Sequence, residues 1–214
     1  MMKYPIGIQT FDKIINGGFV YIDKTALIYK LVQGSTYFLG RPRRFGKSLL
    51  ISTLESYFLG KKELFKGLAI DSLETEWKQY PVFHIDFGTG NYLNDGELEE
   101  TLNAHLSEWE KQYSITNSYQ SFGLRLSQIL KTAHEKTGLG CVVLIDEYDK
   151  PILDALDLDA KVEHLGMQIT LEEKHRNIMK SFYATFKSAD ADLRFVFLTG
   201  VTKFSQISVF SGFN

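Results

Sequence analysis

The sequence contains one cysteine, four prolines and no long uninterrupted apolar segment. The single thiol, Cys141, excludes an internal disulfide and a cysteine-rich zinc site, and it fits a reducing compartment. No window approaches the roughly 20 apolar residues that a membrane span requires. The N-terminal segment carries polar residues where a signal peptide needs an apolar stretch. We therefore expect a cytoplasmic protein with no membrane partner.

The sequence also lacks an excess of positive charge, since its formal net charge is −2. No global positive field would draw the protein onto nucleic acid, so such binding would require a local basic patch or a partner domain. The five histidines show no H-E-x-x-H spacing, which argues against a zinc protease. The absence of a G-x-S-x-G sequence argues against an α/β-hydrolase nucleophile elbow.

What is present predicts one α/β domain. The chain has 214 residues, of which 44% are hydrophobic, enough for a substantial core. Short apolar segments predict strands at 37–39, 82–87, 141–145 and 195–198, and segment 19–22 is also rich in β-formers. Amphipathic segments predict helices at about 26–31, 49–58, 98–113, 122–133 and 171–188. Strands separated by helices predict a parallel sheet with helices on both faces.

The segment FLGRPRRFGKSLL, residues 38–50, has the features of a phosphate-binding loop (Walker A): a strand, a turn, a lysine, a hydroxyl residue and a helix. Gly46 would let the backbone approach the phosphates. Lys47 would reach the β- and γ-phosphate oxygens, and the Ser48 hydroxyl would ligate Mg²⁺. The remaining residues of the expected nucleotide-binding segment are Arg43, Arg44, Phe45 and Leu49.

This match is degenerate, because the usual pattern has a glycine where this chain has Arg41, and Gly40 comes one residue too early. The alternative interpretation is a helix N-terminus that follows a basic loop. Arg41, Arg43 and Arg44 form a basic cluster that would complement nucleotide charge, face a partner or nucleic acid, or remain solvated.

A second motif, CVVLIDEYDKP at residues 141–151, resembles a Walker B strand. Asp146 would hold Mg²⁺, directly or through water, and Glu147 would orient and deprotonate the attacking water. Acidic residues are common at strand ends, so this motif alone is moderate evidence. For Asp149 and Lys150, a structural turn ahead of Pro151 is favoured over catalysis.

The third segment is FVFLTGVTKFS, residues 195–205. A polar residue at the end of this strand would lie between the phosphate loop and the water. That position suits Thr199 as a γ-phosphate sensor, with Thr202 as the competing choice. For Lys203, a solvated loop lysine is favoured over contact with the phosphates.

Four separated strings together resemble the predicted AAA-ATPase-like family of Bacteroidetes-type bacteria. They are YPIGIQTFDKIINGGFVYIDKT, RPRRFGKSLL, IDEYDKP and LTGVTKFSQISVFSGFN. The resemblance implies a phosphate-binding role for Gly46, Lys47 and Ser48, and metal and base roles for Asp146 and Glu147. The loop of that family reads R-P-R-R-F-G-K-S, so Arg41 departs from the general pattern and not from the family. The resemblance also implies that the stretch 21–25 lies near the adenine.

Members of this family usually continue into more ATPase sequence and commonly into a PD-(D/E)XK-type nuclease domain. We therefore expect residues 1–214 to form one P-loop AAA-ATPase-like domain that is truncated at its C-terminus. The expected fold is a P-loop NTPase of the additional-strand, catalytic-glutamate type, lacking its last strand and lid. Its phosphate-loop strand would then be an exposed edge, open to pairing with another chain.

The sequence thus predicts an ATPase that uses ATP and Mg²⁺, in which Lys47, Glu147 and Thr199 are catalytic and Ser48 and Asp146 hold the metal. Hydrolysis would drive a conformational switch coupled to a missing effector, with nucleic acid as one conceivable target. The main alternative is a nucleotide-binding switch or interaction module with little or no hydrolysis. A P-loop kinase for a small acceptor is a further alternative. Preference for ATP or GTP and assembly into a homo-oligomer stay open.

Overall fold

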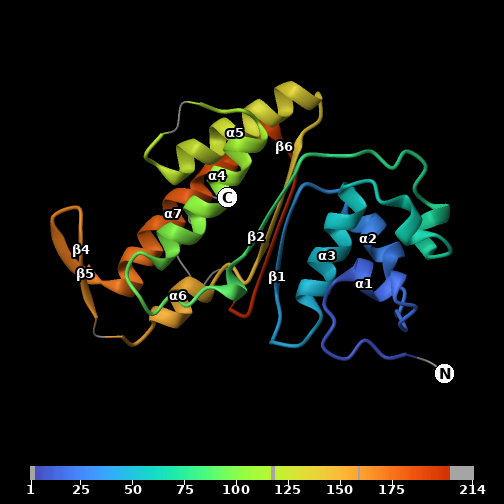
Figure 1. The fold of residues 1–214 in the computed structure, drawn as a ribbon, viewed down its shortest axis with the longest axis horizontal. Helices are drawn as coiled ribbons and strands as arrows, with labels where there is room; N and C mark the ends of the chain where they lie inside the picture. The colour runs from blue at the N-terminus through green and yellow to red at the C-terminus, as the bar shows by residue number, and fades with distance from the viewer. Residues whose placement is uncertain (1–2, 117–118, 159, 203–214) are drawn as a thin grey trace.

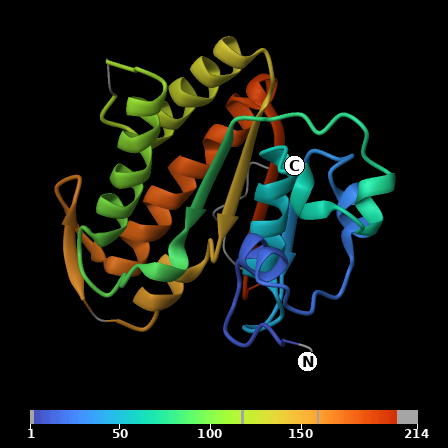
Figure 2. The ribbon, with the colours of Figure 1, turned by 45° about the vertical axis from the view of Figure 1, so that its right-hand side comes forward.

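The computed structural model describes residues 3–116, 119–158 and 160–202. Its centre is a four-stranded sheet with helices on both faces, and a small two-stranded hairpin stands apart from it (Figures 1 and 2). The strands of the sheet are β1 (Thr36–Gly40), β2 (Val82–Asp86), β3 (Cys141–Asp146) and β6 (Leu193–Gly200). All four predicted strands are confirmed, with ends that differ by a few residues.

The strand order in the sheet is β1-β6-β3-β2, and every pair is parallel. The last strand in the chain, β6, therefore lies between the first strand, β1, and β3. Among the described strands, β1 and β2 form the two edges of the sheet. Parallel pairing brings the carboxyl ends of all four strands to the same edge, which is where ligands bind in sheets of this kind.

Helices cover the two faces of the sheet as separate layers (Figure 1). One layer contains α1 (Phe11–Asn16), α2 (Thr25–Leu31), α3 (Lys47–Phe58) and the short 3₁₀ helices η1 (Lys62–Phe65) and η2 (Ala69–Ser72). The other layer contains α4 (Glu97–Gln112), α5 (Phe122–Thr137), α6 (Lys150–Ala155) and α7 (Leu171–Ser188). Two further 3₁₀ turns are η3 (Phe87–Thr89) and η4 (Asp190–Asp192).

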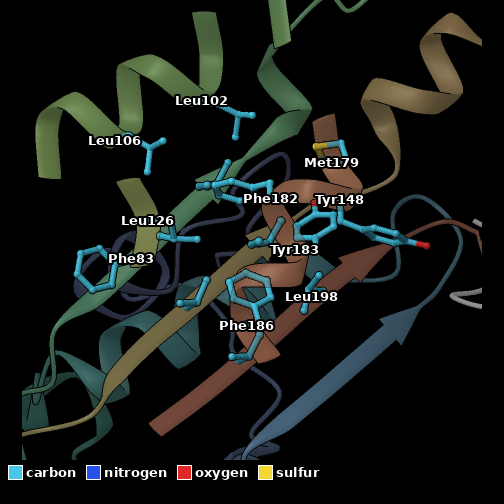
Figure 3. Packing of buried hydrophobic residues seen from close by; sticks show 14 of the residues in the cluster. Phe83, Leu102, Leu106, Leu126, Tyr148, Met179, Phe182, Tyr183, Phe186 and Leu198 are labelled. Carbon is cyan, nitrogen blue, oxygen red and sulfur yellow. The ribbon is translucent and has the colours of Figure 1, made fainter. Parts of the chain in front are cut away.

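The alternating side chains of β3 divide between the two layers. Val142 and Leu144 belong to the core beneath α3, whereas Val143 and Ile145 belong to the core beneath α4, α5 and α7. Figure 3 shows the second of these cores, where side chains of α4, α5 and α7 meet those of the sheet. Because β3 is buried along its whole length, its residues form the unbroken apolar run seen in the sequence. Cys141 is buried there, and burial raises the pKa of its thiol to about 12.

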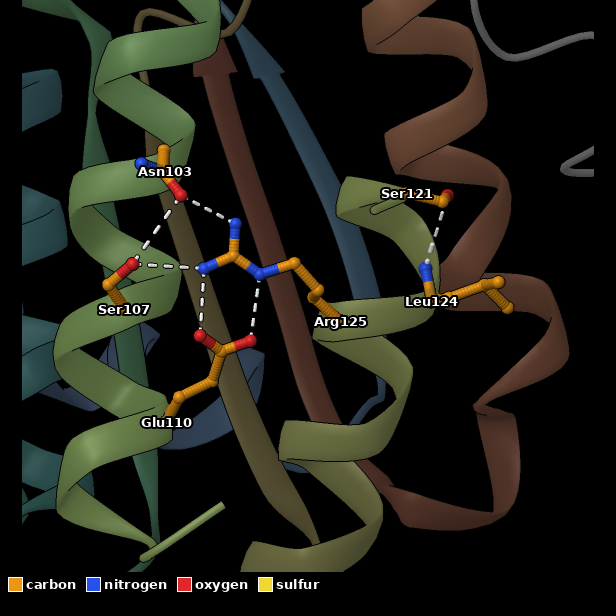
Figure 4. A network of polar contacts seen from close by, with 6 residues as sticks. All are labelled: Asn103, Ser107, Glu110, Ser121, Leu124 and Arg125. Carbon is orange, nitrogen blue, oxygen red and sulfur yellow. Dashed lines mark hydrogen bonds and ion pairs between the residues drawn. The ribbon is translucent and has the colours of Figure 1, made fainter. Parts of the chain in front are cut away.

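A buried ion pair joins α4 to α5 (Figure 4). The Arg125 guanidinium donates from Nε to Oε1 of Glu110 at 2.7 Å and from Nη2 to Oε2 at 2.8 Å. Its remaining contacts are to Asn103 Oδ1 at 2.6 Å and Ser107 Oγ at 3.0 Å. Both charged residues are less than 9% exposed. The pairing is bidentate, so it fixes the orientation of α5 against α4 as well as satisfying both charges.

Several local features differ from the expectations. Segment 19–22 forms no strand, and only Phe19 makes an isolated bridge, to Lys3. The six-residue helix α1 and the hairpin formed by β4 (Lys161–His164) and β5 (Met167–Thr170) were not predicted. Just before α2, Asp23 Oδ1 accepts hydrogen bonds from the amide and the hydroxyl of Thr25, while the N-cap residue, Lys24, makes no side-chain cap hydrogen bond. Across the ranges that the structure describes, no helix meets the length and apolarity that crossing a membrane requires.

Candidate functional site

The candidate site lies at the carboxyl edge of the sheet, where three of the sequence motifs meet. In the strand register, Leu39 pairs with Thr199 and Ile145 pairs with Leu198. The end of β1, the Thr199 position of β6 and the acidic pair at the end of β3 are therefore adjacent along this edge. The backbone also connects them, because Arg41 N donates to Gly200 O at 3.0 Å.

The loop between β1 and α3 turns sharply just before the helix. Arg44 has φ 67° and Gly46 has φ 74°, both in the left-handed region. A glycine adopts this conformation without strain, which explains Gly46 at the last position before the helix. Gly46 occupies the N-cap position of α3 and provides no side-chain cap. The first amide N–H groups of α3 thus lack a side-chain acceptor at the cap, as at the helix ends that bind phosphate.

Lys47 lies across this loop, and Ser48 follows it in the first turn of α3. The Lys47 side chain is buried, at 5% exposed, and its Nζ donates to Arg41 O at 3.2 Å and Pro42 O at 3.3 Å. Both acceptors are carbonyl groups of the loop, so the ammonium group stays within the turn. Ser48 is half-buried.

Asp146 is a buried carboxylate, only 2% exposed, held by two donors. Its Oδ1 accepts a hydrogen bond from the hydroxyl of Thr199 and another, at 3.0 Å, from the backbone N–H of Glu147. Thr199 is fully buried, and its carbonyl accepts from Tyr148 N at 2.9 Å. The end of β3 is thereby tied to β6 through side chain and backbone alike.

Glu147 has φ 52°, which is uncommon for a residue other than glycine. Burial raises the pKa of its carboxyl group, and the negative charges of Asp146 and Asp86 raise it further, whereas Lys47 and Arg43 oppose the rise. The phosphate loop and the acidic pair are thus close enough to act on each other electrostatically. The structure brings together the two regions that the sequence placed around one triphosphate.

The remaining residues predicted to bind nucleotide lie on the outer side of the loop. Arg43 and Arg44 are exposed, and Phe45 is 68% exposed. Phe45 and Leu49 line an apolar groove of about 640 Å³ that extends from the phosphate loop toward the N-terminal segment. The other apolar or aromatic residues that line the groove are Tyr4, Pro5, Ile14, Val20, Tyr21, Ile22, Leu27, Ile28, Leu31 and Leu50.

The structural interpretation of Asp149 is favoured by its contacts. Asp149 is 1% exposed, and its Oδ2 accepts from Val201 N at 2.9 Å, Thr202 N at 2.7 Å and Thr202 Oγ1 at 2.6 Å. Tyr148 adds a hydrogen bond between its hydroxyl and Thr202 Oγ1 at 3.1 Å. Asp149 thus fastens the segment after β6 to the segment after β3. Thr202 is engaged in this fastening, which leaves Thr199 as the threonine beside Asp146.

Lys150 also has a structural setting, because its Nζ donates to Gly90 O at 2.7 Å and to Asp154 Oδ2 at 2.5 Å. Lys203 lies outside the described residues. Asp86, the last residue of β2, is in register with Asp146 and was not predicted as a site residue. The signal was available, since Asp86 is a polar residue near the carboxyl end of the strand predicted at 82–87, and Asp146 and Thr199 directly follow two other predicted strands.

Metal binding at this site would depend on few protein ligands. Within the described part of the chain, no group of three or more His, Cys, Asp or Glu side chains could hold a metal ion. A hydroxyl at Ser48 and a carboxylate at Asp146 nevertheless suit Mg²⁺, which keeps several waters and is bound through one or two protein oxygens together with phosphate. The donor set therefore fits a magnesium ion that arrives with a nucleotide.

Comparisons with known proteins identify a family and one curated relative. The family model described as "Predicted AAA-ATPase" matches residues 5–210. A curated protein from Azotobacter chroococcum mcd 1, described as an uncharacterized protein in the vnfD 5′ region, is 39% identical over 214 residues. This alignment covers 99% of the present chain and 40% of the relative. No solved structure matches the chain.

Proposed function

The chain belongs to the predicted AAA-ATPase family, and from that premise we propose that residues 1–214 form one P-loop domain that binds Mg²⁺-ATP and hydrolyses it. The observation that carries the proposal is the meeting of Lys47 with Asp146 and Glu147 at one edge of the sheet. The strand order supports it as well. The position of β6 between β1 and β3 supports our assignment of the sheet to the additional-strand, catalytic-glutamate type.

The phosphates would bind at the N-terminus of α3. The amides after Gly46 would donate to phosphate oxygens, and the Lys47 ammonium would move from the loop carbonyls to the β- and γ-phosphates. Arg43 and Arg44 are exposed beside this turn, so they would add positive charge from the solvent side.

Ser48 and Asp146 would hold the magnesium ion. When bound, Mg²⁺ supplies charge neutralisation and orientation of the β- and γ-phosphate oxygens. The Thr199 hydroxyl donates to the Asp146 carboxylate and so helps to orient it, and from this position it would sense the γ-phosphate. Burial of both side chains excludes water from their contact.

Glu147 would orient the attacking water and accept its proton. Its side chain is half-buried, and burial, together with the negative charges of Asp146 and Asp86, raises its pKa, which makes it a stronger proton acceptor than an exposed glutamate. Catalysis would then consist of positioning and charge neutralisation around an in-line attack. The result would be a conformational switch that drives an effector. The chain spans only 40% of the length of the curated relative, so the effector is part of this proposal.

The apolar groove beside the phosphate loop would accommodate the nucleobase. Leu27 is 62% exposed and Phe45 is 68% exposed, so each presents apolar surface that a base would cover. The groove begins at Gly46, within reach of the phosphate site.

Titration calorimetry with Mg²⁺-ATP and Mg²⁺-GTP tests the binding site. We expect Lys47→Ala to weaken nucleotide binding by at least about tenfold, because it removes a charge-assisted contact to phosphate. Lys131→Ala is the matched control, since Lys131 is an exposed lysine of α5 paired with Glu135. Equal nucleotide affinity in the wild type and Lys47→Ala would contradict the site.

Phosphate-release assays test hydrolysis separately. We expect Glu147→Gln to bind ATP like the wild type and to lose turnover, because the amide cannot accept the proton of the water. If the wild-type protein binds ATP but hydrolyses it no faster than Glu147→Gln, the alternative of a nucleotide-binding switch without hydrolysis is correct. ADP formation that depends on an added hydroxyl substrate would instead support a kinase.

A further inference from the structure

The turn that follows β2 is fastened both to its own strand and to the segment after β3. Asp86 Oδ1 accepts a hydrogen bond from Gly88 N at 2.7 Å, which closes the 3₁₀ turn η3. Gly90 O accepts the hydrogen bond from Lys150 Nζ at 2.7 Å. Phe87, the first residue of the turn, is fully buried. The turn therefore has one defined position relative to the end of β3.

The carboxylate of Glu147 rests against this turn at Gly88. A Cβ atom added to Gly88 would lie 3.4 Å from Glu147 Oε2 and 2.8 Å from Asp86 Oδ1. Gly88 is exposed and its φ lies outside the left-handed region, so neither core packing nor backbone conformation requires glycine here. The missing side chain leaves room for the Asp86 carboxylate that closes the turn, whereas 3.4 Å from Glu147 Oε2 is an ordinary van der Waals distance.

The backbone of Glu147 is held in place by its neighbours. The residue is held in the left-handed region at φ 52°, its N–H donates to Asp146 Oδ1, and its carbonyl accepts from Lys150 N at 3.0 Å. The backbone of Glu147 and the turn at Gly88 are both held in place, and the Glu147 side chain rests against that turn. Together they limit the positions that the Glu147 carboxylate can take. Lys150 contributes to both, because its backbone binds Glu147 and its side chain binds Gly90.

We propose that Gly88 is a positioning residue for Glu147: the turn that Asp86 holds after β2 sets the place of the Glu147 carboxylate, and the absence of a side chain at Gly88 lets Asp86 close that turn. This inference rests on the proposed function, in which Glu147 accepts the proton of the attacking water. Gly88 itself contacts no reacting group, and it acts only through the position of Glu147.

The test is Gly88→Ala, with ATP binding and turnover measured separately. The added methyl group forces Asp86 Oδ1 to move and so loosens the turn against which the Glu147 carboxylate rests. Misplacement of a catalytic group by about 1 Å lowers the rate of a positioned reaction by about 100-fold. We therefore expect kcat to fall by about 10- to 100-fold while the Kd for Mg²⁺-ATP stays within about twofold of the wild type. The phosphate loop and its lysine are untouched by the change.

Gly140→Ala is the matched control. An added Cβ at Gly140 would also be crowded, at 3.1 Å from Arg194 Cβ and N, but Gly140 directly precedes β3 at the opposite end of that strand from Glu147. General loss of packing would affect both variants, whereas displacement of Glu147 would affect kcat in Gly88→Ala alone. Thermal unfolding of both variants verifies that each is folded at the assay temperature.

A double-mutant comparison shows whether Gly88 acts through Glu147. In the Glu147→Gln background, Gly88→Ala should cause no further fall in the residual rate, because the group that it displaces has already lost its function. An equal fall in both backgrounds, or a wild-type kcat in Gly88→Ala, overturns the inference and leaves the proposed function intact. A wild-type protein that binds ATP without turnover overturns both.

Discussion

The Thr199 hydroxyl donates a hydrogen bond to the Asp146 carboxylate, joining the ends of β6 and β3 where the phosphate loop passes. Both side chains are buried, so neither can exchange this bond for one to water. A change in the position of β6 would therefore change the position of the carboxylate that we assign to the metal. This contact links β6 directly to the proposed metal site.

Thr199→Val tests that link, because valine keeps the shape of threonine and removes the donor. We expect a loss of about 1 to 3 kcal/mol in the free energy of unfolding, since a buried carboxylate loses one of its donors. We also expect slower hydrolysis. Thr199→Ser retains the hydroxyl and should keep most of both properties. Denaturant unfolding and phosphate release on the two variants check this, and identical behaviour of the valine and serine variants would contradict it.

Asp149→Ala should be among the most destabilising single changes in the described chain. It removes the acceptor of three hydrogen bonds from Val201 and Thr202, and two of the donors are backbone N–H groups. We expect a loss of about 3 kcal/mol, because hydrogen bonds to a charged group contribute about 1.5 to 3 kcal/mol and partly overlap here. Asp190→Ala, at an exposed position, is the control. A loss below about 0.5 kcal/mol would show that the fastening does not matter for stability.

For the buried Arg125–Glu110 pair we predict that the losses in the free energy of unfolding are strongly non-additive in a double-mutant cycle. Removing either partner leaves an uncompensated buried charge, so Arg125→Met and Glu110→Gln should each cost about 3 to 5 kcal/mol. The double variant should cost clearly less than the sum of the two. The exposed pair Lys131–Glu135 is the control, at about 0.3 to 0.5 kcal/mol. If denaturant unfolding shows that the two losses in free energy simply add, the bidentate contact does not stabilise the folded protein.

The pair formed by Glu55 of α3 and His84 of β2 predicts a pH dependence of stability. The hydrogen bond from His84 lowers the pKa of Glu55. Burial lowers the pKa of His84, but the hydrogen bond and charge of Glu55 outweigh this effect and raise it overall. The lowered pKa of Glu55 therefore adds to the free energy of unfolding at pH values above its ordinary pKa of 4.5. The raised pKa of His84 adds to it at pH values below its ordinary pKa of 6.5.

The two contributions therefore overlap between about pH 4.5 and 6.5 and fade as the pH rises through the raised pKa of His84. Glu55→Gln should cost about 0.5 to 1 kcal/mol near pH 5.5, because the pair is partly exposed, and less at pH 8. Unfolding free energies of the wild type and the variant at both pH values measure this. A cost that grows between pH 5.5 and pH 8 would show that the pair is not the cause.

The main strands and helices could be predicted because their apolar residues follow simple periods. Residues 141–145 form an unbroken apolar run because β3 is covered on both faces. The hairpin of β4 and β5 was missed because its short strands are only partly buried and its turn is Leu165-Gly166, not one of the common Asn-Gly or Asp-Gly turns. The helix α1 has six residues, too few to establish a helical period.

The candidate site was predictable to the extent that its residues lie next to each other in the chain. Gly46, Lys47 and Ser48 form one motif, and Asp146 and Glu147 form another. The partners of Asp149 could not be found in the same way, because Val201 and Thr202 are 52 and 53 positions away. Gly88 was unpredictable for the same reason, since only the folded chain brings it against Glu147.

The position of β6 also has a consequence for how the chain is made. Among the described strands, β1 pairs only with β6, yet β1 ends at residue 40 and β6 begins at residue 193. During synthesis the phosphate loop therefore leaves the ribosome long before the strand that joins it to β3. A nascent chain that has not yet reached β6 has β1 on one side and the β2–β3 pair on the other, with no strand to join them. Each part then exposes an apolar strand edge, and such species aggregate and engage chaperones.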